Sequence, residues 1–174
     1  MTTIFAIGHS TRPLDKFIEI LQAHGITLLA DIRTIPRSQH NPQFNEESLA
    51  HELPKAMIQY RHLKELGGLR HAAKDSINTG WENSSFRGYA DYMQTQEFVH
   101  AVRGLIDLAK GKHIAIMCAE GNPFRCHRSL VADALTVRGV RVLHISSRKS
   151  AETHRLTAFA KVDGTRITYP GKET

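Results

Sequence analysis

Four short apolar runs restrict how this chain can fold more than any other feature. They span residues 4–7, 28–30, 114–117 and 140–145. Short runs in which apolar residues follow one another are typical of strands that are buried on both faces, as in a parallel sheet. A sheet buried in this way needs helices on both sides. The runs therefore predict an α/β fold.

Helical patterns lie between the predicted strands. Leu14, Phe17 and Leu21 recur at the spacing of one helical face, Pro13 suits the helix start and Gly25 suits its end. Strand, helix and strand within about 30 residues form a βαβ unit. The first unit of the chain is therefore predicted to be of this type.

A second unit follows the same logic near the C-terminal half. A helical pattern covers residues 96–110, and Leu130, Val131 and Ala134 share a helical face after the third run. The length of 174 residues suits one domain. We therefore expect a single domain over residues 1–174, with a mainly parallel sheet flanked by helices in three layers.

The middle of the chain is less regular. Leu49 and Leu53 suggest a short helix that Pro54 ends, and residues 57–63 suit a further strand. Residues 67–90 are rich in Gly, Asn and Ser and are interpreted as a long loop. Long loops inside compact domains are usually functional or mobile.

Polar residues follow each of the first three predicted strands. The C-terminal ends of parallel strands lie at one edge of a sheet, where ligands bind. These side chains should therefore converge on one site, although they are far apart in the sequence. They are His9, Ser10, Asp31, Arg33, Cys118 and Glu120.

The segment from Cys118 to Ser129 gives the most specific indication of a reactive group. A thiol between a strand and a helix N-terminus gains thiolate character from peptide N–H groups, and Arg125 and Arg128 add positive charge. The arrangement resembles the anion cradle of rhodaneses and cysteine-dependent phosphatases, with one residue more than the phosphatase loop and a proline within it. On this basis Cys118 is expected to be more reactive than Cys126.

A second interpretation of the same segment gives its residues other roles. Asn122 and Pro123 suit an N-cap and first helical position, so the helix would start at Pro123. Cys126 would then lie one turn inside the helix as an inert thiol, and His127 would join the buried helical face.

Structural roles also remain open for the strand-end residues. Asp31 and Arg33 suit a plain ion pair, Cys118 suits a buried structural thiol, and Ser10 suits a cap for the helix near Pro13.

Composition limits the classes of function. The net charge is +6, and a basic segment at 148–174 suits either a solvated surface or the attraction of anions. Two cysteines make a poor disulfide framework, so we expect a cytoplasmic protein with reduced thiols. No apolar run is long enough to cross a membrane. The cysteine and histidine spacing matches no zinc motif, and dinucleotide and P-loop motifs are absent, so neither metal nor cofactor is expected.

Several motifs in one order resemble the domain-of-unknown-function 488 proteins of bacteria and archaea. The resemblance extends over essentially the whole chain and supplies a set of motifs without an activity. The residues that carry it are Ile7–Thr11, Asp31–Arg33 with Pro36, Tyr60, Leu66–Gly68, Tyr89 with Tyr92 and Met93, Cys118–Glu120, Cys126–Arg128, His154–Thr157 and Ile167–Pro170.

Three functions fit these features. The first is an enzyme, a Cys-dependent transferase or hydrolase, acting on a small anionic substrate such as a phosphorylated metabolite or nucleotide. In it, Cys118 would be the nucleophile or redox thiol, with His9, Asp31 and Glu120 as acid–base groups. The second is a nucleic-acid-binding module that uses the basic tail and the aromatic residues near Trp81. The third is a ligand sensor without chemistry. The residues expected to contact the substrate are Ser10, Arg33, Cys126, His127 and Arg128.

Overall fold

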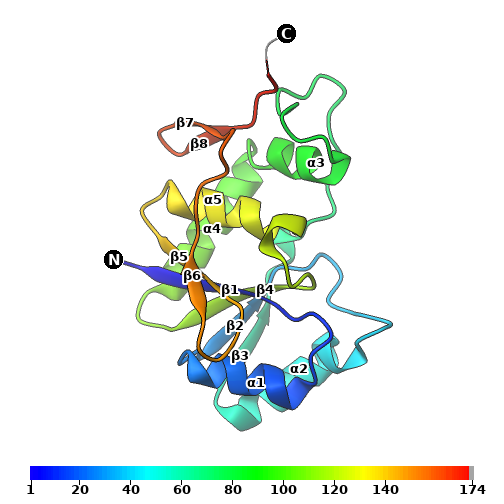
Figure 1. Ribbon diagram of the computed structural model, residues 1–174, viewed down its shortest axis with the longest axis vertical. Coiled ribbons are helices and arrows are strands. Elements are labelled where there is room, and N and C mark those ends of the chain that lie inside the picture. Colours follow the sequence, from blue (N-terminus) through cyan, green and yellow to red (C-terminus); the bar gives the residue numbers. More distant parts are fainter. Residues whose placement is uncertain (173–174) are drawn as a thin grey trace.

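The computed structural model describes residues 1–172 and is built around a six-stranded sheet (Figure 1). Five neighbouring strands run parallel and the last one, β6, is antiparallel to β5. In their order across the sheet the strands are β3 (Gln59–His62), β2 (Leu28–Asp31), β4 (Ile114–Cys118), β1 (Thr3–Gly8), β5 (Arg141–Ile145) and β6 (Ala151–Thr153).

Helices cover both faces of this sheet. Two of them pack on one face and three on the other, and a small hairpin of β7 and β8 lies beyond the second group (Figure 1). The elements are α1 (Leu14–Ala23) and α2 (Glu46–Glu52) on the first face, α3 (Ser84–Tyr92), α4 (Gln96–Ala109) and α5 (Arg128–Thr136) on the second, then β7 (Lys161–Asp163) and β8 (Arg166–Thr168). The predicted three-layer α/β fold with a mainly parallel sheet is confirmed.

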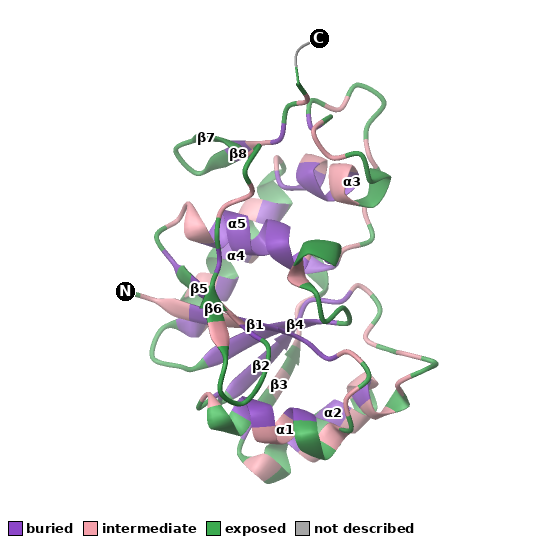
Figure 2. Cartoon of the chain, in the orientation of Figure 1, coloured by how far each residue is buried: buried purple, intermediate pink, exposed green. Residues whose placement is uncertain are grey.

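Alternation along the strands builds two separate cores. Every residue of β2 and β4 is buried, and these strands lie between the helical layers (Figure 2). Successive side chains point to opposite faces of a sheet. Ile114 and Ile116 therefore pack toward α3–α5, whereas Ala115 and Met117 pack toward α1 and α2. The apolar runs are continuous because both faces need apolar side chains.

One expectation for the middle of the chain differs from the structure, and two are confirmed. The segment 67–90 is not all loop, because Ser84–Tyr92 forms α3. The side chain of Asn83 accepts hydrogen bonds from the N–H groups of Ser85 and Phe86, so this polar stretch caps a helix. The helix expected before Pro54 ends at Glu52 and continues as a 3₁₀ turn, and the strand expected over 57–63 is β3.

The expected helix starting at Pro123 is also wrong. Residues Pro123–Arg125 form one 3₁₀ turn, which the side chain of Asn122 caps through the N–H of Phe124. The backbone is extended at Cys126, and α5 begins at Arg128. Pro123 therefore starts a turn that is not continued, and Cys126 precedes the helix instead of lying within it.

Among the described residues, no helix combines the length and apolarity that crossing a bilayer would require.

Gly8 ends β1 at a point where the backbone of another loop touches it. A Cβ atom at this position would lie 1.7 Å from the carbonyl oxygen of Glu120. We therefore expect Gly8→Ala to lower the free energy of unfolding by about 1–3 kcal/mol or more, because the loop after β4 must shift. Urea denaturation measures the change.

Gly104 is the matched control for this substitution. It lies inside α4, and a Cβ atom there meets nothing within 4 Å. Gly104→Ala should raise stability by about 0.5–1 kcal/mol because alanine favours the helix. Equal effects of the two substitutions would contradict the close approach at Gly8.

Candidate active site

The ends of β1 and β4 meet at one edge of the sheet. The N–H of His9 donates to the carbonyl of Cys118 over 2.9 Å, and the N–H of Ser10 donates to that of Ala119 over 2.9 Å. β2 is the other neighbour of β4, and Asp31 ends it. The structure thus brings together the three strand ends that the sequence placed at one edge.

The pleat of the strands nevertheless divides the expected residues between the two faces. Cys118 belongs to the core beneath α3–α5. His9 stacks on Phe44, and Asp31 accepts a hydrogen bond from Tyr60. Phe44 and Tyr60 both lie on the α1–α2 side of the sheet. We call His9, Asp31, Arg33 and Tyr60 the Asp31 cluster. The thiol cluster comprises Cys118, Cys126, His127 and Arg128.

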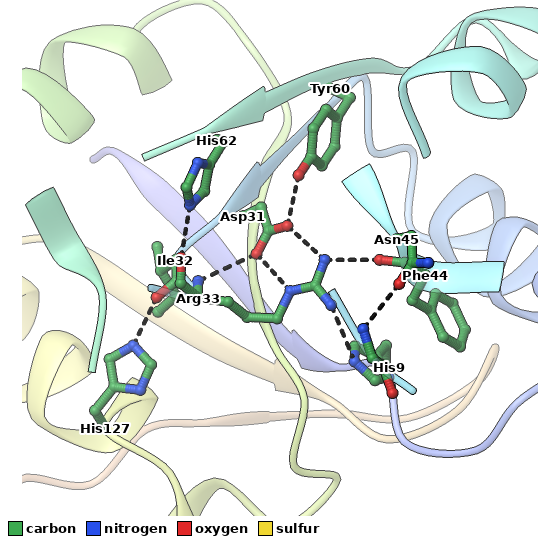
Figure 3. Close-up of polar contacts among 10 residues, drawn as sticks. His9, Asp31, Ile32, Arg33, Phe44, Asn45, Tyr60, His62 and His127 are labelled. Carbon is green, nitrogen blue, oxygen red and sulfur yellow. Dashed lines mark hydrogen bonds and ion pairs between the residues drawn. The ribbon is translucent and has the colours of Figure 1, made fainter. Parts of the chain in front are cut away.

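Asp31 is fully buried and its carboxylate accepts four hydrogen bonds (Figure 3). Oδ1 accepts from Nε of Arg33 at 2.9 Å and from the Arg33 N–H at 3.1 Å. Oδ2 accepts from Nη2 of Arg33 at 2.7 Å and from the Tyr60 hydroxyl at 2.6 Å. This geometry favours the interpretation of Asp31 and Arg33 as a structural ion pair, because no carboxylate oxygen is left free to move a proton.

The charges of the Asp31 cluster keep Tyr60 and Arg33 protonated. Burial and the neighbouring Asp31 raise the pKa of Tyr60 far above its ordinary value, so the phenol remains a hydrogen-bond donor. Burial opposes the charge of Arg33, but its bonds to Asp31 outweigh burial and raise its pKa. Nη2 of Arg33 also donates to the carbonyl of Phe44 at 2.7 Å.

His9 is a buried neutral donor and acceptor in this structure. Nδ1 lies 2.7 Å from the carbonyl of Ser10, to which it can only donate, so Nε2 is left as the acceptor facing Nη1 of Arg33 at 3.4 Å. Burial lowers the pKa of His9, and the positive charge of Arg33 adds to this effect. Its ring stacks on Phe44 with centroids 4.4 Å apart. His9 therefore orders the loop after β1.

The backbone after Asp31 connects the two clusters. The carbonyl of Ile32 accepts a hydrogen bond from Nε2 of His127 at 2.8 Å (Figure 3). The next carbonyl, that of Arg33, accepts from Nε2 of His62 at 2.6 Å. The ion pair that fixes Arg33 therefore also fixes the acceptor that orients His127.

Cys126 and His127 form a thiol–imidazole pair. Sγ of Cys126 lies 3.4 Å from Nδ1 of His127, and the N–H of Arg128 donates to this sulfur at 3.5 Å. Because Nε2 of His127 donates to Ile32, a neutral ring leaves Nδ1 as an acceptor toward the thiol. When the thiol proton moves to Nδ1, the pair becomes a thiolate beside an imidazolium. The geometry is suited to this transfer.

The two thiols differ in how they hold a negative charge. The adjoining Cys118 side chain lowers the pKa of Cys126 to about 4 against the effect of burial, with further help from His127 and the N–H of Arg128. Burial raises the pKa of Cys118 well above its ordinary value, and the adjoining Cys126 raises it further. These pKa directions favour Cys126 as the thiolate, in place of the expected Cys118.

Carbonyl groups of the loop after Cys118 point toward Cys118 and Arg128. The carbonyl of Glu120 accepts from Sγ of Cys118 at 3.6 Å and from Nη1 of Arg128 at 3.3 Å. Nη2 of Arg128 donates to the carbonyl of Gly121 at 3.2 Å. A cradle for an anion needs N–H groups in these places. Arg128 is only 1% exposed, and its Nη1 and Nη2 hold two carbonyl groups of this loop.

A cavity of about 350 Å³ opens beside the thiol cluster. Of the expected site residues, Arg33, Cys118, Glu120, Cys126 and His127 line it, whereas His9, Ser10, Asp31 and Arg128 lie outside its wall. The remaining lining residues, none of which was among the expected site residues, include two further arginines. They are Thr34, Ile35, Arg37, Gly68, Leu69, Ser85, Phe86, Ala119 and Arg125.

Ser10 does not cap α1. Its backbone adopts a positive φ of 53°, and Pro13 is the N-cap residue of α1 without a side-chain cap. Glu120 is exposed on the cavity wall, and it is the one carboxylate among the cavity-lining residues. Of the expected acid–base residues, it alone faces the cavity.

Gly68 and Tyr60 have structural roles that sequence reasoning did not assign. A Cβ atom at Gly68 would lie 2.6 Å from Nδ1 of His127, so only glycine lets the ring stand in its observed place. The hydroxyl of Tyr60 donates one of the four hydrogen bonds that the Asp31 carboxylate accepts. The Leu66–Gly68 turn and Tyr60 were visible as motifs, but their contacts depend on pairings across the fold. Within residues 1–172, no group of three His, Cys, Asp or Glu side chains could hold a metal ion.

The fold and the site define an α/β protein with a mainly parallel sheet and two buried thiols, one at the end of β4 and one before α5. A family model described as "Domain of unknown function DUF488" matches residues 13–135, which is more than half of the chain. The protein belongs to this family. The match leaves out Ile7–Thr11 and the residues near the C-terminus that also resemble the family. No curated protein and no solved structure matches the chain.

The buried ion pair gives a stability prediction. Asp31→Asn leaves the guanidinium of Arg33 without its counter-charge, and we expect it to lower the free energy of unfolding by about 3–5 kcal/mol. Tyr60→Phe is the milder control, because it removes one hydrogen bond to a charged group and should cost about 1.5–3 kcal/mol. Urea denaturation compares the two variants. A smaller loss for Asp31→Asn than for Tyr60→Phe would show that Arg33 finds another partner.

Proposed function

We propose that the protein is an enzyme in which Cys126 is the nucleophile toward a small anionic substrate bound in the cavity. The observation that carries the proposal is the pair of Cys126 and His127 on the cavity wall, with the far nitrogen of the ring tied to Ile32. This pair supplies a thiolate and a proton donor at one point. The neighbouring Cys118 favours the ionised form of Cys126, and we do not assign Cys118 the attacking role.

The reaction class follows from the two groups. Sγ of Cys126 forms a bond to an electrophilic centre of the substrate, and the bond from that centre to its leaving group breaks. The leaving group takes the proton from Nδ1 of His127. Release of the transferred group to water or to an acceptor then restores the thiol. This sequence describes a transferase or a hydrolase with a covalent intermediate.

Charge on the cavity wall favours an anion. Arg33, Arg37 and Arg125 line the cavity, and the single carboxylate of Glu120 opposes them. Arg33 is neutralised by Asp31, and Arg37 pairs with Glu47 at 2.7 Å across an exposed surface, where an ion pair is weak. Arg125 is exposed on the loop between the two cysteines. We therefore assign Arg125 the main role in holding the anion, in place of the Arg33 and Arg128 clamp expected from the sequence.

The nucleic-acid alternative has less support from the aromatic side chains. Trp81 packs on Phe86, Phe159 and Tyr169 with ring centroids 4.9–5.5 Å apart. Rings engaged with each other are poorly placed to stack on bases. A sensor that binds the same anion without turnover shares the cavity, and the reactivity of Cys126 separates it from the enzyme.

The order of thiol reactivity tests the proposal. Iodoacetamide labelling across pH 5 to 9 should modify Cys126 first, and labelling should already proceed at pH 6, because the folded state keeps this sulfur ionised. Peptide mass spectrometry measures the rate at each cysteine. Cys118→Ser keeps a hydroxyl donor beside Cys126 and should retain most of that reactivity.

Labelling of Cys118 before Cys126, or of neither until the chain unfolds, would remove Cys126 as the nucleophile. An unreactive Cys126 combined with anion binding would favour the sensor.

Anion binding gives a second test. Inorganic phosphate should slow the alkylation of Cys126 in the wild-type protein, because it occupies the cavity beside the sulfur. Arg125→Gln should weaken this protection several-fold. Arg103→Gln, on the exposed surface of α4, removes the same charge elsewhere and should leave the protection unchanged. Equal protection in both variants would mean that Arg125 does not hold the anion.

A further inference from the structure

The two cysteines lie on one cavity wall and interact with each other. Both line the cavity and belong to the core beneath α3–α5, and each thiol affects the pKa of the other. Cys126 also faces Nδ1 of His127 and the N–H of Arg128. Both cysteines are free in this structure. When Cys126 is ionised, a thiolate and a second thiol thus share one cavity wall.

We propose that this pair is a site of reversible oxidation, in which a hydroperoxide oxidises Cys126 and Cys118 then closes an intramolecular disulfide. The inference rests on the proposed function, because it uses Cys126 as the same thiolate. It adds a second reaction, a second class of small molecule and a role for Cys118 that substrate transfer does not need.

The first step forms a sulfenic acid. The thiolate of Cys126 attacks one oxygen of the hydroperoxide, the O–O bond breaks, and the leaving oxygen takes the proton from Nδ1 of His127 as water or an alcohol. The sulfur is oxidised by two electrons and the peroxide is reduced by two. A peroxide has few atoms, so the cavity of about 350 Å³ admits it easily.

The second step uses Cys118. Its sulfur attacks the sulfur of the sulfenic acid, an S–S bond forms, and the hydroxyl leaves with the Cys118 proton as water. The sum of both steps is a dithiol and a hydroperoxide giving a disulfide, an alcohol or water, and one further water. An external thiol reverses the change by exchange.

The chain between the cysteines permits this closure. An S–S bond is about 2.05 Å long, so the sulfurs must approach more closely than in a hydrogen bond. Cys118 is fixed at the end of β4, and the intervening segment 119–125 is exposed except for Pro123. Cys126 has an extended backbone before α5 begins. The movable side of the pair is therefore Cys126 with its exposed loop.

The disulfide should be easily reduced. Closing it removes the contacts of the ionised Cys126 with His127 and with the N–H of Arg128. A reduced form that is stabilised by such contacts makes the corresponding disulfide a stronger oxidant. We expect mild thiol reductants to restore both free cysteines.

The experiment treats the intact protein with a small excess of hydrogen peroxide and digests it with trypsin without reduction. Cleavage after Arg125 and Arg128 separates the cysteines, so a disulfide joins the peptide 113–125 to the peptide 126–128. We expect this linked pair, a loss of two hydrogen atoms from the mass of the monomer, and recovery of both thiols with dithiothreitol.

Two variants assign the steps. In Cys118→Ser the sulfenic acid cannot be resolved, so dimedone should trap it at Cys126 at least several-fold more than in the wild type. In Cys126→Ser, Cys118 should remain a free thiol under the same treatment. The reference for both variants is the disulfide-linked peptide pair of the wild-type protein.

Several results would overturn the inference. These are oxidation of Cys126 to sulfinic acid without a linked peptide, disulfides only between chains, or equal dimedone trapping with and without Cys118. Rapid alkylation of Cys126 in the same preparation would leave the proposed function standing while this inference fails. If Cys126 neither alkylates nor oxidises, both fail together.

Discussion

The buried bond between Asp31 and Arg33 sets the position of most of the site. Two charges removed from water are stable only when their hydrogen bonds are completed, and here Tyr60 and the carbonyl of Phe44 complete them. The same contacts fix the backbone that follows β2. Its Ile32 carbonyl then determines which nitrogen of His127 carries a proton. An ion pair on one face of the sheet thereby controls a thiol on the other.

The chemistry of the thiol cluster comes from an unequal sharing of charge between two sulfurs. A negative charge on either sulfur is costly in an apolar setting, and Cys118 is 1% exposed with the core on one side. Cys126 has the N–H of Arg128 and the ring of His127 beside its sulfur, whereas the Cys118 thiol faces the carbonyl oxygen of Glu120. Donors stabilise an anion and acceptors do not. Local polarity therefore decides between two residues of the same type.

The sequence predicted the layers of this fold well because buried parallel strands leave a direct signal in apolar runs. It also located the edge where Cys118, Asp31 and His9 end their strands. The sequence did not show that these three side chains lie on different faces of the sheet, because the position of a strand end does not say to which face each side chain points. One residue of register moves a side chain across the sheet, so Asp31 lies with Tyr60 while Cys118 lies with Cys126.

Local signals that compete were harder to interpret. Asn122 and Pro123 are good helix-start residues, and they do start a turn, but the chain straightens again at Cys126. Asn83 is equally typical of a loop, yet it caps α3. The three short strands after residue 150 carry little apolar periodicity and were not predicted. In each case contacts with distant segments determine the outcome, and a single sequence does not display them.

The order of strands also affects how the chain assembles during synthesis. β1 is the first strand to be made, yet both of its partners, β4 and β5, lie beyond residue 113. β2 can pair with β3 soon after it is made, but its other edge waits for the same β4. Closing such distant pairs is slow, and unpaired strand edges are prone to join other chains. The arrival of one strand, β4, therefore joins β1 to β2 and brings Cys118 to its place in a single event, before β5 and β6 are added beside β1.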